Sequence, residues 1–170
     1  SAHIRWAEKR VHFSPGGESH DRFKGLFDEA VLAEKFAAIG ADTVLVYGEA
    51  YGGKQQGMRE TYGIDLRFIV FDIQIGGLWL SVPQMDEVAL AIGLEVVEWE
   101  KLPTDLAALD AVRDRPSAQS VRNGCGVKPR EGVVLRPLIE VTKNNGDRII
   151  AKHKGEAFEE RKTPQKVVDP

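Results

Sequence analysis

The sequence predicts one α+β domain built around a mainly antiparallel sheet, on three observations. The 170 residues, 42% of them hydrophobic and 29% charged, suffice for one compact domain with a sizeable core. Short apolar segments rich in β-branched residues indicate strands, and these do not alternate regularly with helices as in a Rossmann-type sheet. No apolar run approaches the roughly 18 residues of a membrane span, and the single Cys125 cannot form an internal disulfide. We therefore expect a soluble, cytoplasmic protein without a membrane partner.

The N-terminal half is expected to hold most of the sheet. In chain order it predicts a strand pair over residues 2–6 and 9–13, a helix over 22–39, and buried strands over 43–47 and 66–75. Gly40 is the expected end of the helix, and Gly76 and Gly77 close the last strand.

The C-terminal half predicts shorter elements separated by a long loop. They are a helix over 83–92, a strand over 94–99, a helix over 104–112 with Thr104 as N-cap, a loop over 113–130, and strands over 132–135 and 148–154. A loop of that length usually has a function.

Charges are unevenly distributed along the chain, although the formal net charge is only −3. Residues 122–166 hold 11 Lys or Arg against 6 Asp or Glu, whereas residues 1–121 hold 12 against 19. This asymmetry is typical of a local site for an anionic ligand or of a solvated basic face, and charge alone favours the solvated face.

Three strand ends carry charged residues that are candidates for chemistry. Glu49 follows a buried strand among glycines, which let a ligand approach closely, and Glu131 precedes an apolar strand. Lys152 and Lys154 share one face of the last strand, because side chains of a strand alternate with a period of two. Two neighbouring ammonium groups suit a polyphosphate, although lysines also protect sheet edges.

Several common kinds of site are excluded by the sequence. The four histidines are scattered and Cys125 has no spaced partner, so no zinc-type cluster is present. No glycine-rich segment ends in the Gly-Lys-Ser/Thr of a phosphate-binding loop, and no Gly-x-Ser-x-Gly elbow of a serine hydrolase occurs.

Four segments, in this order, resemble the motif series of the ATP-dependent RNA ligases, in their RNA ligase 2-like branch. That branch belongs to the covalent nucleotidyltransferase superfamily, with DNA ligases and mRNA capping enzymes. The segments are Tyr47–Gly52 (motif III), Phe68–Ile73 (motif IIIa), Glu131–Pro137 (motif IV) and Ala151–Lys154 (motif V). The resemblance implies a ligase-type nucleotidyltransferase (adenylation) domain over residues 1–160, with flanking helices, followed by a tail or linker stub over 161–170.

Two further segments resemble parts of the family without a clear role. They span residues 16–20 and 117–124, and their His20, Gln119, Arg122 and Asn123 are candidates for turns as much as for ligand contacts.

One family motif does not occur in this sequence. Motif I, Lys-x-(Asp/His)-Gly, carries the lysine that attacks ATP, and residues 1–5 resemble the segment that follows it. We therefore expect the domain to be N-terminally incomplete, and no lysine present takes the nucleophile's role. The family also uses an arginine after motif I, for which Arg5 and Arg10 are both candidates.

The resemblance implies an ATP-dependent RNA ligase that joins RNA 5′-phosphate and 3′-hydroxyl ends through enzyme-AMP and RNA-adenylate intermediates, in RNA repair. Its cofactors would be ATP and Mg²⁺ or Mn²⁺, and its partners RNA ends. Lys152 and Lys154 would lie beside the α-phosphate and offset its growing charge. Glu131 would hold the metal and serve catalysis, and Glu49 would contact the ribose or the metal.

Three of the roles that the resemblance implies have rival interpretations within the sequence. Phe71 would stack on adenine, but a phenylalanine in a strand of this composition is usually part of the core, and Phe68, on the opposite face, is the alternative stacking ring. Arg136 is a candidate phosphate or RNA contact, but it is also placed to pair with Glu140. Glu131, assigned to the metal, is also placed to cap a turn.

Other functions remain open at this point. A DNA ligase or a capping-type enzyme would differ in polynucleotide or nucleotide. A non-catalytic nucleotide- or RNA-binding module would bind ATP without sealing, and an unstable piece would not unfold cooperatively.

Overall fold

A computed structural model describes residues 1–53 and 65–158, and its largest element is a six-stranded sheet. The strands are β1 (Ala2–Ala7), β2 (Arg10–Ser14), β3 (Val44–Gly52), β4 (Leu66–Ile75), β5 (Leu78–Trp79) and β6 (Glu95–Val96). They are ordered β2-β1-β3-β4-β5, all antiparallel, and β6 alone pairs in parallel, with β4. The predicted α+β class with a mainly antiparallel sheet is confirmed.

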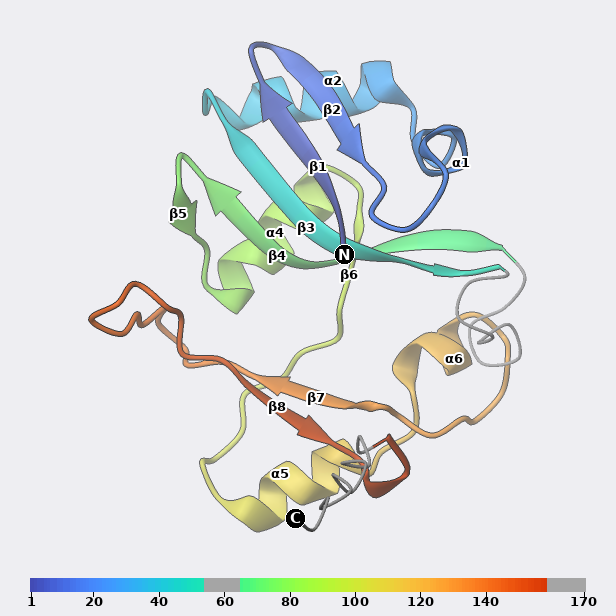
Figure 1. The fold of residues 1–170 in the computed structure, drawn as a ribbon, viewed down its shortest axis with the longest axis vertical. Coiled ribbons are helices and arrows are strands. Elements are labelled where there is room, and N and C mark those ends of the chain that lie inside the picture. The colour runs from blue at the N-terminus through green and yellow to red at the C-terminus, as the bar shows by residue number, and fades with distance from the viewer. Residues whose placement is uncertain (54–64, 159–170) are drawn as a thin grey trace, which may run out of the picture.

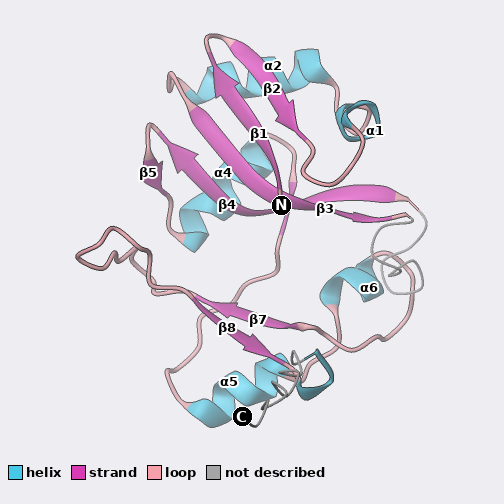
Figure 2. Cartoon of the chain, viewed as in Figure 1, coloured by secondary structure: helices cyan, strands magenta, loops and turns pink. Residues whose placement is uncertain are grey.

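A second, two-stranded sheet lies apart from this main sheet (Figure 1). Its antiparallel strands are β7 (Gly132–Leu135) and β8 (Ala151–Lys154). The helices are α1 (His20–Lys24), α2 (Glu29–Ile39), α4 (Val82–Ala91), α5 (Leu106–Arg113) and α6 (Ala118–Arg122), and a 3₁₀ turn spans Glu156–Phe158. In Figure 2, α2 and α4 lie behind the main sheet, while α5 lies on the side of β7–β8 that faces away from it.

One face of the main sheet forms the core with the helices. Ile4 and Val46 from the sheet are fully buried with Phe36 of α2 and Met85 of α4. Trp6 stacks on Phe36 with ring centroids 5.9 Å apart. Because strand residues alternate, the other face, which we call the open face, carries the remaining side chains of β1, β2 and β3.

The predicted helix over 22–39 is wrong in one respect, because the chain forms two helices. Gly25 ends α1, and Asp28 begins α2 by accepting a hydrogen bond from the Val31 N–H at 3.1 Å. Likewise Asp105, rather than Thr104, caps α5, since its carboxylate accepts the Ala108 N–H at 3.0 Å.

Several strand boundaries also differ from the prediction. The strand expected over 94–99 shrinks to β6, the one expected over 148–154 shrinks to β8, and β5 was not predicted. The loop expected over 113–130 contains α6, whose N-cap Ser117 accepts the Ser120 N–H at 3.3 Å. The predicted tail over 161–170 lies outside the described residues. None of the helices in the described ranges is long and apolar enough to cross a bilayer.

Candidate functional site

A β-bulge in the main sheet sets the position of Phe71. Tyr47 pairs with Asp72 and Gly48 pairs with Val70, so Phe71 is the extra residue of β4. Bulges redirect side chains locally, and Phe71 is 37% exposed between buried neighbours. The structure thus allows Phe71 and Phe68, the two candidates for the stacking ring, to be compared by their exposure.

Phe68 belongs to the core. Its side chain is buried, and its ring meets those of Phe23 and Phe27 edge to face at 5.3 and 5.8 Å. A Cβ atom on Gly48 would overlap the Phe68 ring and the Ile69 carbonyl oxygen, so glycine is required beside the bulge. Of the two rings, only Phe71 is accessible to a ligand.

Glu49 follows Gly48 on β3, next to the bulge. Its side chain is half exposed, and its Oε2 lies 3.7 Å from the amino group of Ser1. Because Glu49 pairs with Ile69 across the sheet, it lies on the strand adjacent to Phe71 and two residues away in register.

The β7–β8 hairpin places Glu131, Lys152 and Lys154 at neighbouring positions of the backbone. Lys154 pairs with Gly132 and Lys152 with Val134, while the Glu131 carbonyl accepts the Gly155 N–H at 2.9 Å. A Cβ on Gly132 would lie 2.5 Å from the His153 carbonyl oxygen and 2.8 Å from the Lys154 Cα. Glycine at this position therefore permits the close approach of the two strands.

His153 orients the hairpin. Its Nε2 lies 2.7 Å from the Asp110 carboxylate and 3.3 Å from the Arg113 guanidinium, both on α5. Since consecutive strand residues point to opposite sides, Lys152 and Lys154 point away from α5. Figure 1 shows the main sheet on that side of β7–β8.

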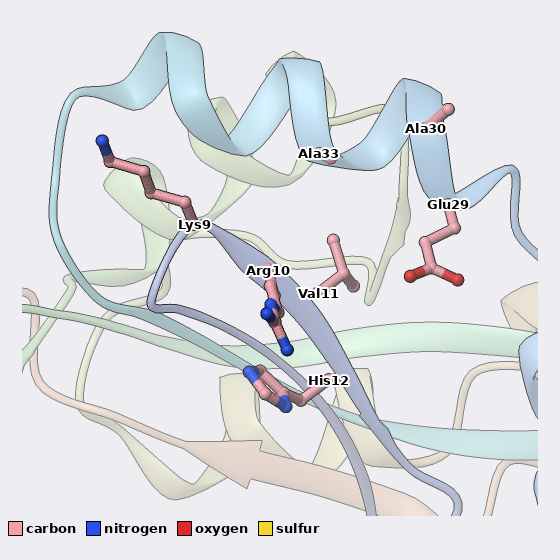
Figure 3. Close-up of a pocket in the computed structure, with 7 residues that line it drawn as sticks. All are labelled: Lys9, Arg10, Val11, His12, Glu29, Ala30 and Ala33. Atoms are coloured by element: carbon pink, nitrogen blue, oxygen red, sulfur yellow. The ribbon is translucent and has the colours of Figure 1, made fainter.

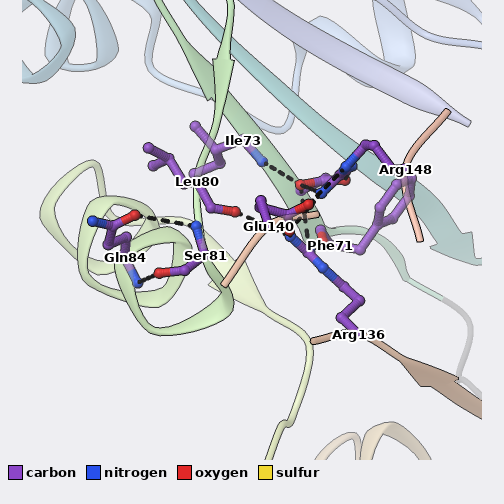
Figure 4. Close-up of polar contacts among 9 residues, drawn as sticks. Phe71, Ile73, Leu80, Ser81, Gln84, Arg136, Glu140 and Arg148 are labelled. Carbon is purple, nitrogen blue, oxygen red and sulfur yellow. Dashed lines mark hydrogen bonds and ion pairs between the residues drawn. The ribbon is translucent and has the colours of Figure 1, made fainter. Parts of the chain in front are cut away.

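Four charged residues join the two sheets, and we call them the inter-sheet ion cluster: Asp72, Arg136, Glu140 and Arg148. Figure 4 shows Arg136, Glu140 and Arg148 side by side. Arg148 contacts Asp72 and lies 2.8 Å from Glu140, while Arg136 contacts Glu140 and lies 3.4 Å from Asp72. The two arginine side chains are only 8% and 12% exposed. Burial alone would raise the pKa of Glu140, but hydrogen bonds from Arg148 and Arg136 outweigh it and hold that pKa below its usual value.

Arg136 also reaches the backbone of the main sheet. Its guanidinium donates to the Phe71 carbonyl at 3.3 Å and to the Leu80 carbonyl at 3.0 Å, and Arg148 lies 4.0 Å above the Trp79 ring. Arg136, which was predicted to contact the cofactor, therefore makes its contacts within the protein. The alternative interpretation, pairing with Glu140, is observed. Arg136 holds Phe71 and the end of β7 together.

The inter-sheet ion cluster connects the two sheets that carry the predicted site residues. Arg136 follows Val134, the partner of Lys152, by two residues, or about 7 Å along a strand. An exposed aromatic ring and a carboxylate on the main sheet thus lie on the side toward which two lysines point. Rings stack on bases and lysines neutralise phosphate, so the donor set suits a nucleotide.

The segment over 117–124 has a structural role that the sequence did not reveal. Arg122 lies 2.9 Å from Glu95, the Tyr51 hydroxyl donates to the same carboxylate at 2.9 Å, and the Asn123 amide donates to the Tyr51 oxygen at 3.4 Å. Burial, with Glu95 adding to it, raises the pKa of Tyr51 to about 12. These contacts dock α6 on the ends of β3 and β6.

A surface depression of about 570 Å³ lies elsewhere, between β2 and α2 (Figure 3). It is lined by Lys9, Arg10, Val11, His12, Glu29, Ala30 and Ala33, and contains none of the six predicted site residues. Within the described ranges, no three or more His, Cys, Asp or Glu side chains gather as a metal site.

The chain resembles known proteins in sequence and in fold. The RNA ligase family model matches residues 6–154. A comparison with curated proteins finds no match. The fold matches a mutant RNA ligase of Naegleria gruberi, solved with AMP and Mn, at a TM-score of 0.63 and 16% identity, over 92% of this chain and 47% of that one. The chain thus spans about half the length of that protein. Because the family model matches most of its residues, the chain belongs to the RNA ligase family.

Proposed function

We propose that residues 1–160 form the nucleotidyltransferase domain of an ATP-dependent RNA ligase that joins 5′-phosphate and 3′-hydroxyl ends in RNA repair. The observation that carries the proposal is the β7–β8 hairpin, which presents Glu131, Lys152 and Lys154 and is tied to Phe71 by Arg136. Each step of such a reaction occurs at phosphorus, so positioning and charge neutralisation dominate catalysis.

Lys152 and Lys154 neutralise the phosphate in this proposal. Negative charge grows on the phosphate oxygens as the attacking oxygen or nitrogen approaches, and two fixed ammonium groups stabilise that charge without reorganising. Phe71 stacks on adenine, and Glu49 accepts a hydrogen bond from a ribose hydroxyl. Arg136 acts as a positioning residue, because its donors are used by the protein itself.

Glu131 and Glu49 are the residues that would hold Mg²⁺ or Mn²⁺. Mg²⁺ is commonly bound by one or two carboxylates together with substrate phosphates and waters, so two carboxylates suffice and the donor set fits. When bound, the ion would supply further neutralisation of phosphate charge.

The test begins with RNA that already carries a 5′-adenylate, together with an acceptor 3′-hydroxyl and Mg²⁺. The motif Lys-x-(Asp/His)-Gly occurs nowhere in residues 1–170, and this last step needs no nucleophilic lysine. We expect sealing, reduced at least 100-fold in Lys152→Ala and in Glu131→Ala. Lys101→Ala, an exposed lysine outside the hairpin, is the matched control.

Two outcomes contradict the proposal. One is a cooperatively folded chain that binds AMP but seals nothing, which would indicate a nucleotide-binding module. The other is sealing that Lys152→Ala leaves unchanged. Preference for GTP, or for DNA ends, would instead indicate a capping-type enzyme or a DNA ligase.

A further inference from the structure

We propose that Arg5, Arg10 and His12 form a binding surface for the phosphate backbone of single-stranded RNA, on the open face of the main sheet. We call these three residues the β1–β2 basic cluster. The inference rests on the proposed function, since it gives the RNA strand a place outside the β7–β8 hairpin.

Strand register places the three side chains together. Arg5 pairs directly with His12, and Arg10 lies two residues before His12 on the same strand. Directly paired Cβ atoms are about 5 Å apart, and diagonal or next-but-one neighbours about 7 Å. All three groups therefore fall within reach of one or two neighbouring phosphates.

The cluster faces away from the core. Ile4 and Val11, which alternate with these residues along β1 and β2, are buried against the helices. In Figure 3 the Arg10 and His12 side chains point to the same side of β2, away from α2. Arg5 and Arg10 are exposed.

Unlike most arginines of the described chain, those of the cluster have no carboxylate partner. Arginines that do pair with a carboxylate are Arg22, Arg113, Arg115, Arg122, Arg130, Arg136 and Arg148. Among the described residues, no carboxylate lies within 4.0 Å of Arg5 or Arg10. Leu45, on the other side of Arg5, is uncharged.

Neighbouring arginines without a carboxylate partner are suited to bind an anion. Arg5 and Arg10 are diagonal neighbours of like charge on adjacent strands, and such charges repel each other unless negative charge lies between them. Arginine forms two parallel hydrogen bonds to a phosphate, which makes it the preferred residue for nucleic-acid backbones.

Aromatic rings next to the cluster favour RNA over a free phosphate. His3, two residues from Arg5, lies 5.7 Å from Tyr47, measured between ring centroids. Base-stacking rings beside a cationic track are typical of single-strand binding surfaces.

The test measures binding of a fluorescent single-stranded RNA by anisotropy at several salt concentrations. For Arg5→Ala/Arg10→Ala we expect about 10- to 100-fold weaker binding at low salt. The slope of log K against log salt should fall by about 1.4, since each phosphate contact on a single strand contributes about 0.7. Arg22→Ala/Arg115→Ala, which removes the same charge from two paired surface arginines, is the control and should bind as the unchanged chain.

AMP binding and the thermal unfolding midpoint are measured on the same variants. The inference requires RNA affinity to fall while AMP affinity and folding are retained. It is overturned if the variant binds RNA with unchanged affinity and salt slope, or if AMP affinity falls and RNA affinity does not. Sealing is measured separately from RNA binding. If the unchanged chain binds RNA but seals nothing, and the double variant loses that binding, the binding surface is upheld and the proposed ligase activity is contradicted.

Discussion

The main sheet and the β7–β8 hairpin are held in place by different forces. The main sheet buries a continuous apolar layer against α2 and α4, with Phe36 and Met85 fully inaccessible. The hairpin leaves Val134 58% exposed and is attached through an ion pair of Arg148 with Asp72 and a polar contact of His153 with Asp110. Apolar burial resists changes in pH and salt, whereas ion pairs respond to both. The main sheet with α2 and α4, which we call the platform, thus carries a hairpin that is attached to it by polar contacts.

The largest effect is expected from the core of the platform. Phe36→Ala removes a fully buried ring stacked on Trp6, and should lower the free energy of unfolding by about 3–5 kcal/mol. Urea unfolding followed by tryptophan fluorescence measures this loss. Val134→Ala on the hairpin is the matched comparison, and should change it by less than about 1 kcal/mol. Similar losses in both variants would contradict the division into two regions.

A smaller loss is expected from the inter-sheet ion cluster. Asp72→Asn leaves the buried Arg136 and Arg148 with Glu140 alone, and should cost about 3 kcal/mol. Because the hairpin is held through this contact, sealing of adenylylated RNA should fall together with stability.

A double-mutant cycle separates the ion pair from general damage. Asp72→Asn/Arg148→Gln should lose less than the sum of the two single losses, by about 1–2 kcal/mol. Strict additivity would mean that Asp72 and Arg148 do not interact energetically, and that the hairpin is held by other contacts.

In both regions, the strands that consist of a continuous, largely apolar segment were the easiest elements to predict from sequence. The ends of β4 follow from a ten-residue, largely apolar segment closed by Gly76, and β7 follows from its own short apolar run. The spacing of apolar residues along the sequence indicates that one continuous segment is buried, and burial of such a segment is what stabilises these strands.

The parts that sequence could not predict depend on distant partners. Arg136 was a candidate phosphate contact because nothing local shows that Asp72, 64 positions away, takes up its charge. The bulge that exposes Phe71 depends on register with Tyr47, so Phe68 and Phe71 were equivalent by composition. Pairing across the sheet, rather than local pattern, decides which candidate side chains are available to a ligand.

Gly132→Ala tests the hairpin without changing any charge. The added Cβ meets backbone atoms of His153 and Lys154, so the strands must separate, at a cost of about 1–3 kcal/mol. We expect sealing of adenylylated RNA to fall at least 10-fold because Lys154 is displaced. Gly17→Ala, where a Cβ meets nothing within 4 Å, is the control. Normal sealing by Gly132→Ala would show that the position of Lys154 is unimportant for the chemistry.

The smallest effect concerns Tyr51, at the junction where α6 docks on the platform. Burial raises its pKa from 10.0 to about 12, so the folded protein favours the protonated phenol that donates to Glu95. This contribution to stability is complete below pH 10 and is lost as pH rises toward 12. Tyr51→Phe should cost about 1 kcal/mol at pH 7 and should remove this part of the alkaline decline in urea unfolding experiments. In the unchanged chain, absorbance at 295 nm should show one tyrosine ionising about two pH units after its ordinary value, and that late step should vanish in the variant. A late step that persists in Tyr51→Phe would mean that another tyrosine is the buried one, and that α6 docks without this hydroxyl.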